Sequence, residues 1–219
     1  MQTESLLPRR FLFRFAVPCR YRSPLWSDEQ GALLDASHVL PSLEAIEGRI
    51  APIEMRAAWS EEGLAFVVEV RGKRQAPWCH EGRIDESDGL RLWIDTRDTH
   101  NIHRASRFCH QFAFLPGGGG RNSLEPLARP VLINRAKEHP RAIPRESLAA
   151  FSKPDAQGYT LHCRIGAAAL TGFDPAEHPK LGFQFAVIDR ELGTYTFSVG
   201  AGMPYHEDPS VWGTLELVR

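Results

Sequence analysis

Two alternating segments, joined by a short polar turn, constrain the fold of this chain most strongly. The first covers residues 87–97 and the second covers residues 108–114. Successive side chains of a strand point to opposite faces, so residues of one parity share a face. One predicted face, the inward one, carries Leu90, Leu92, Ile94, Phe108, His110, Phe112 and Phe114, and the other carries Arg91, Trp93, Asp95 and Gln111. The pattern predicts two half-buried antiparallel strands.

Similar alternation recurs along the chain, bounded by Gly, Pro, Asp or Asn. The further predicted strands are 11–17, 53–59, 64–70, 159–165, 181–187, 195–199 and 213–217. Such short strands at regular spacing predict an all-β fold, a two-sheet antiparallel β-sandwich of jelly-roll type. We expect one domain over residues 1–219, with little helix beyond short turns at 144–151 and 167–170. The Gly-rich run 116–120 predicts a flexible connector, and residues 121–144 predict a surface excursion or one edge strand.

Charge and hydropathy exclude several classes of function. The 26 basic and 27 acidic residues give a formal charge of -1, so no overall field draws the chain to nucleic acid or to an anionic membrane. No apolar run is long enough for a signal peptide or a membrane span, and we therefore expect a cytoplasmic protein. The four cysteines lack paired spacing, which favours reduced thiols. The oligomeric state does not follow from the sequence.

Five motifs follow one another in order along the chain. They span roughly residues 35–219, and the N-terminal strand 11–17 adds to them. The motifs are Trp59 with the hairpin strand 63–70, the stretch 88–95, the Gly-Tyr strand 158–165, the stretch 181–189 and the closing stretch 209–217. Together they resemble a family 9 carbohydrate-binding module, or the wider DOMON-like group of β-sandwiches.

This resemblance implies a slot between two aromatic rings that grips the end of a saccharide, with polar neighbours pairing its hydroxyls. Trp78 stands where the first ring is expected. No tryptophan stands near residues 197–200, where the second ring is expected, and Tyr205 is the substitute from the next loop. Gln111 falls near a polar contact of the family, and Arg91 stands where an acidic contact is common. Trp93 shares their polar face, so the candidate ligand-binding residues are Trp78, Arg91, Trp93, Gln111 and Tyr205.

Other chemistry has weaker support in the sequence. His100, His103, Cys109 and His110 are residue types that bind zinc or copper, but the alternation places His110 on the inward face, which favours a hydrogen-bonded core histidine. Asp85, Glu86, Asp88, Asp95 and Asp98 leave a structural calcium open, although their spacing is not that of an EF-hand. Glu69, Asp88 and Asp95 do not form a recognisable glycosidase pair. We therefore expect no enzyme and no required cofactor.

Three functions remain. The first is a non-catalytic ligand-binding domain with a degenerate sugar slot, whose partner is a saccharide or another small molecule. The second is a structural or protein-interaction domain that has lost the slot. A metal-binding or glycoside-processing domain is the third.

Overall fold

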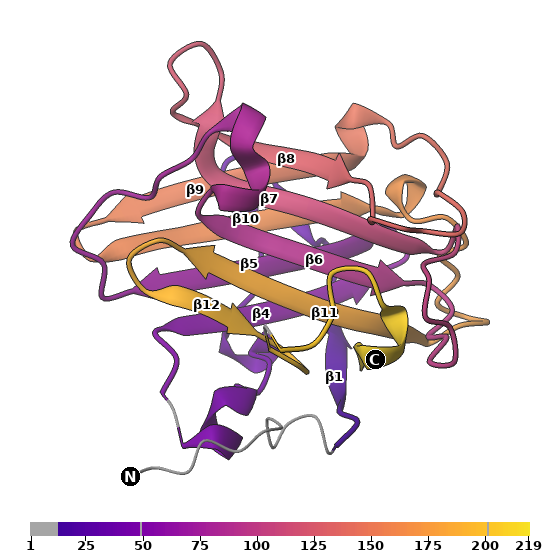
Figure 1. The fold of residues 1–219 in the computed structure, drawn as a ribbon. Helices are drawn as coiled ribbons and strands as arrows, with labels where there is room; N and C mark the ends of the chain where they lie inside the picture. The colour runs from indigo at the N-terminus through magenta and orange to yellow at the C-terminus, as the bar shows by residue number, and fades with distance from the viewer. Residues whose placement is uncertain (1–12, 49, 201) are drawn as a thin grey trace, which may run out of the picture.

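A computed structural model describes residues 13–48, 50–200 and 202–219, and in this part of the chain strands dominate (Figure 1). The main strands are β1 Ala16–Tyr21, β4 Ile53–Ser60, β5 Gly63–Arg71, β6 Gly89–Asp95, β7 Cys109–Gly119, β8 Glu125–Val131, β9 Leu148–Asp155, β10 Gly158–Gly166, β11 Lys180–Asp189, β12 Gly193–Thr196 and β13 Gly213–Val218. A separate small pair is β2 Trp26–Ser27 with β3 Gly31–Ala32. Six short 3-10 helices occur among the described residues: η2 Ala36–His38, η3 Leu43–Glu47, η4 Glu81–Glu86, η5 Arg145–Ser147, η6 Ala167–Ala169 and η7 Pro209–Val211.

The main strands form a sandwich, which confirms the predicted fold class. Their hydrogen-bonded order is β8-β7-β6-β11-β13-β1-β4-β5-β10-β9, with β12 beside β11. The path folds over, so that β8, β7, β6 and β11 form one layer in front of β9, β10, β5 and β4 (Figure 1). Pairing is antiparallel except at β1, which runs parallel to both β13 and β4.

The core lies between the two layers and is built from the inward positions of both. Phe66 of β5 and Phe183 of β11 stack across it with ring centroids 5.9 Å apart. In β6 the inward residues Leu90, Leu92 and Ile94 are fully buried, as the alternation predicts. Gly89 opens this strand at φ +137°, where an added Cβ would lie 2.3 Å from the carbonyl oxygen of Phe114. The close approach of β7 therefore requires glycine at this position.

Several sequence predictions need correction. The first strand is not 11–17: residues 11 and 12 lie outside the described part, and β1 begins at Ala16 because its parallel register with β13 starts there. The Gly-rich run is mostly strand, since β7 continues through Gly119 and pairs with β8 across an irregularity. The expected helical turns at 144–151 reduce to η5, because β9 starts at Leu148 and pairs with Ile165 of β10.

The second face of β6 also differs from the prediction. The alternation predicts half-buried central strands, yet Arg91, Trp93 and Asp95 are all buried. Trp93 packs with Ile133 and Trp212, which come from the segments that follow β8 and β12. Long connections therefore cover the outer face of the front layer, and the candidate site lies beneath them.

No helix among the described residues is long and apolar enough to cross a membrane.

Candidate functional site

A cavity of about 350 Å³ lies on the outer face of the front layer, and we call it the face pocket. Its lining includes Asp85, Arg91, Trp93, Gln111, Asn134 and Tyr205, together with Val131, Leu132, Ile188 and His206. Four of the five residues singled out from the sequence thus meet in one cavity, although they come from β6, β7 and the loop before β13. Trp78 does not line it.

Small residues beside Arg91 leave the room for this pocket. Across the sheet, Arg91 of β6 is paired with Ala113 of β7 on one side and with Ala186 of β11 on the other. Directly paired side chains on one face of a sheet are neighbours, so two alanines beside a long side chain lower the surface around it. The adjacent row carries the larger Trp93 between Gln111 and Gln184, which forms a wall.

Trp93 and Tyr205 form the aromatic part of the lining. Their rings meet edge to face, with centroids 5.3 Å apart and planes at 86°. The loop that carries Tyr205 is held in place because Nε1 of Trp212 donates to the carbonyl oxygen of Tyr205 at 2.7 Å. By contrast, Nε1 of Trp93 is buried and has no acceptor among the described residues. The pocket wall therefore contains an indole N–H whose hydrogen bond is unmade.

Trp78 has a different environment from the one the resemblance implies. The guanidinium of Arg190 lies 3.5 Å from its ring centroid, and that of Arg83 lies 5.3 Å away. Its backbone N–H donates to Oδ2 of Asp88 at 3.0 Å, which fixes the segment before β6. The Trp78 ring therefore contacts two guanidinium groups of the same chain and lies outside the lining of the face pocket.

A buried ionic network that the sequence reasoning missed supports this region. Nζ of Lys73 lies 2.5 Å from Oδ2 of Asp189 and 3.3 Å from Oδ2 of Asp88, and all three residues are buried. The backbone N–H of Arg190 donates to Asp88 at 2.9 Å. Lys73 stands between Arg71 and Arg74, which are exposed, and no local signal in the sequence distinguishes it from them.

His110 is a core residue, with 1% of its surface exposed. Its Nε2 accepts a hydrogen bond from the backbone N–H of Thr171 at 2.8 Å, while Nδ1 has no partner among the described residues. Burial lowers the pKa of His110 to about 4. The ring is therefore neutral near pH 7, and the sequence expectation of a hydrogen-bonded core histidine holds for one of its two nitrogens.

The other members of the proposed metal cluster have separate partners. His100 contacts Asp98 and Thr214, at 2.9 and 3.1 Å, and His103 contacts Asp208 at 3.1 Å. Cys109 lies beside Ser106, and burial raises the pKa of its thiol to about 12. Within the described residues no group of three or more His, Cys, Asp or Glu side chains is arranged to hold a metal ion.

Four of the five acidic side chains considered for calcium, Glu86, Asp88, Asp95 and Asp98, are likewise engaged by groups of the protein. Glu86 pairs with Arg83 and Arg190, and Asp95 accepts from the backbone N–H groups of Arg97 and Thr99. Of the carboxylates considered for glycoside cleavage, Glu69 pairs with arginines on its own sheet. These carboxylates therefore have structural partners within the chain.

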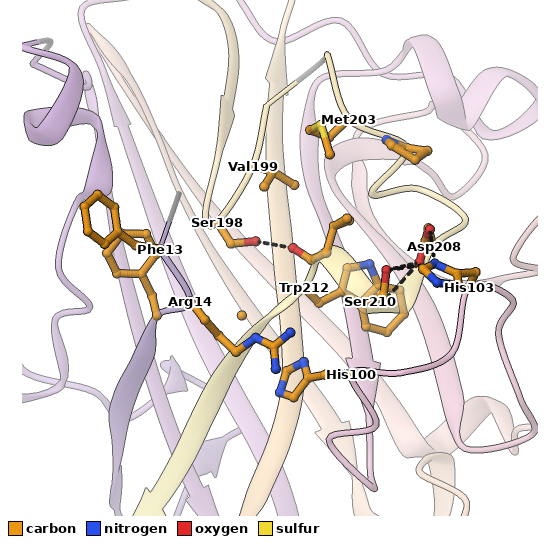
Figure 2. Close-up of a pocket in the computed structure, with 14 residues that line it drawn as sticks. Phe13, Arg14, His100, His103, Ser198, Val199, Met203, Asp208, Ser210 and Trp212 are labelled. Carbon is orange, nitrogen blue, oxygen red and sulfur yellow. Dashed lines mark hydrogen bonds and ion pairs between the residues drawn. The ribbon is translucent and has the colours of Figure 1, made fainter. Parts of the chain in front are cut away.

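A larger cavity of about 620 Å³, the edge cavity, lies where the segment before β1 meets the loop before β13 (Figure 2). Its lining includes Phe13, Arg14, His100, His103, Asp208 and Ser210. The Ser-His-Asp group in it has the wrong geometry for a nucleophile, because Ser210 and Asp208 both approach the same Nδ1 of His103. Ser210 instead donates to Asp208 at 2.6 Å, and Asp208 caps η7.

Comparison with solved structures identifies the fold. A family 9 carbohydrate-binding module from Caldicellulosiruptor kristjanssonii in complex with cellotriose superposes with a TM-score of 0.61, 14% identity and coverage of 93% of each chain. A family 9 module from the same organism in complex with glucose gives a TM-score of 0.61, 14% identity and coverage of 93% of this chain and 96% of that chain. A proposed carbohydrate-binding protein from Bacteroides uniformis ATCC 8492 gives 0.53 and 13% identity, with coverage of 94% and 100%.

No protein-family model matches the sequence, and no curated protein matches it. The structural likeness shows that the chain has the β-sandwich fold of family 9 carbohydrate-binding modules, as its motifs predict.

Proposed function

We propose that this protein is a non-catalytic saccharide-binding domain and that its ligand occupies the face pocket. The observation that carries the proposal is the meeting of Arg91, Trp93, Gln111 and Tyr205 in one cavity on a fold shared with carbohydrate-binding modules. Its volume of about 350 Å³ lies within the usual range for small-molecule sites.

The chemistry of the lining suits a sugar. The Trp93–Tyr205 pair supplies apolar ring surface, against which the C–H face of a pyranose packs. Gln111 carries an amide that makes no hydrogen bond within the described residues, so it is available to a hydroxyl group. A few polar groups beside an aromatic wall are the usual composition of a small-molecule site.

The proposed slot is degenerate, because no tryptophan stands near residues 197–200 and Trp78 lies outside the face pocket. Trp78 stacks with Arg190 instead of forming a second wall, so the ligand meets one aromatic surface. We therefore expect weak binding, because a sugar held by a single aromatic surface buries less apolar area and is less firmly oriented than one held between two rings.

The test is isothermal titration of the purified chain with a glycan panel, followed by two aromatic variants. Tyr205→Ala removes the pocket ring, and Phe13→Ala removes an exposed ring of the edge cavity as the matched control. Loss of binding in Tyr205→Ala alone supports the proposal. Loss in Phe13→Ala alone moves the ligand to the edge cavity, and absence of any saccharide binding leaves the interaction-domain alternative; either result overturns the proposal.

A further inference from the structure

Arg91 is a buried cation in the lining of the face pocket, with 2% of its surface exposed. All of its hydrogen bonds go to backbone carbonyl oxygens. Nη1 donates to Leu90 at 3.3 Å, and Nη2 donates to Ser87 at 2.9 Å and also to Ile84. No carboxylate of the described residues forms an ion pair with Arg91, and its Nε has no hydrogen-bond partner among them.

Lys73 is a second buried cation of this chain, and it has the ion pairs that Arg91 lacks. It has two carboxylates, Asp88 and Asp189, within ion-pair distance. Removing a charge from water is costly unless an opposite charge and hydrogen bonds compensate it. Arg91 is equally buried, but no carboxylate of the described residues lies within ion-pair distance of it, and Asp85 and Asp88 act on its charge only from farther away.

Two further observations concern the charge and the hydrogen-bonding character of the pocket. Asp85 also lines it, but it is exposed and lies beyond ion-pair distance of Arg91, so water screens its charge more strongly than that of the buried guanidinium. The indole N–H of Trp93 adds a second buried donor without an acceptor. The lining therefore carries a buried positive charge, and the complementary ligand carries negative charge.

We infer that the ligand is an acidic saccharide, a sugar that bears a carboxylate, whose charge compensates Arg91. This inference rests on the proposed saccharide site and names the ligand class within it. The charge of Arg91 favours the acidic sugar over the neutral one, while the Trp93–Tyr205 pair packs against the ring of the sugar. The field of a buried cation is weakly screened, so we expect a uronic acid to bind at least roughly tenfold more tightly than its neutral parent sugar.

The experiment compares matched ligands on the full chain by titration calorimetry and ligand-observed NMR. Glucuronic and galacturonic acids are paired with glucose and galactose, and succinate serves as a carboxylate without a sugar ring. The expected result is binding of at least one uronic acid above both its parent sugar and succinate. Added salt should weaken binding of the acid only slightly, because a buried charge is weakly screened, and it should leave binding of the neutral sugar unaffected.

Two charge variants complete the test. Asp85→Asn removes the carboxylate of the lining and is expected to raise the ratio of acid to neutral-sugar affinity several-fold. Arg91→Met is expected to reduce that ratio to about one, and because this buried residue also holds three carbonyl groups, its melting temperature is measured in parallel. The exposed Asp85 variant keeps the inference falsifiable if Arg91→Met does not fold.

The outcomes separate the two proposals. Neutral sugars that bind as tightly as the acids, or an unchanged ratio in Asp85→Asn, overturn the acidic class and leave the saccharide site standing. Succinate that binds as tightly as the uronic acids overturns the assignment to a sugar. If no sugar of either charge binds, the proposed function fails as well.

Discussion

The buried His110 should make the stability of this protein fall as the pH decreases, and the structure gives the size of the effect. Its pKa is about 4 in the folded chain against an ordinary value of 6.5. Protonation at Nε2 would place a donor against the backbone N–H of Thr171, so the folded state resists it. The folded pKa lies below the unfolded one. The contribution is therefore complete above the unfolded pKa and is lost as pH falls through this window.

Each unit between the two pKa values is worth about 1.4 kcal/mol, so the complete loss reaches roughly 3 kcal/mol, of which about 2 kcal/mol is lost by pH 5. Other groups titrate in the same range, including His162, whose pKa burial also lowers. Comparing the wild type with a matched variant cancels the contribution of these other groups. His110→Gln keeps an acceptor for the N–H of Thr171 and does not titrate.

The assay is urea unfolding of both proteins from about pH 7.5 to about pH 5, with the free energy of unfolding extrapolated to water. The wild type should lose roughly 2 kcal/mol more than His110→Gln across this range. His110→Ala, which removes the acceptor and leaves a cavity, should cost roughly 1–3 kcal/mol even near pH 7.5. A constant difference between the wild type and the Gln variant at every pH would refute the reasoning.

Three other variants test the surroundings of the site. Arg190→Ala should uncover the ring of Trp78, raising its fluorescence quenching by acrylamide and lowering stability by about 0.5–1 kcal/mol; unchanged quenching would mean that the cation does not cover the ring. Lys73→Met should cost roughly 3–5 kcal/mol in denaturant unfolding, because it leaves two buried carboxylates without their cation. Trp212→Phe should cost about 1 kcal/mol more than Trp93→Phe, since only the first breaks an indole hydrogen bond; equal costs would contradict the assigned partners.

Alternation along the chain was enough to predict the core face of β6 and the sandwich, because a period of two follows directly from strand geometry. It could not predict that the opposite face is buried too, since the cover comes from segments near Ile133 and Trp212 that are distant in sequence. The helical preference of residues 144–151 was outweighed by pairing with β10, which no local pattern contains.

The residues of the candidate site were also predicted only in part from the sequence. Residue types and their phase brought Arg91, Trp93 and Gln111 together correctly, because three positions on two paired strands determine one surface. The sequence did not predict that Trp78 lies outside the face pocket, because its neighbour in space, Arg190, follows the end of β11. A contact of this kind depends on which strand ends lie close together in the fold. The spacing of residues within one segment of the sequence does not predict it.

The parallel pairing of β1 has a consequence for how this chain is made. Among the described strands, β13 and β4 are bridged only through β1, which hydrogen-bonds to β13 along one edge and to β4 along the other. Residues 16–21 leave the ribosome nearly two hundred residues before their partners at 213–218. During synthesis one edge of β1 and one edge of β11 must therefore wait unpaired, and exposed strand edges are prone to pair with other chains. We therefore expect chaperones that cover exposed strand edges to bind the nascent chain more readily than the folded domain.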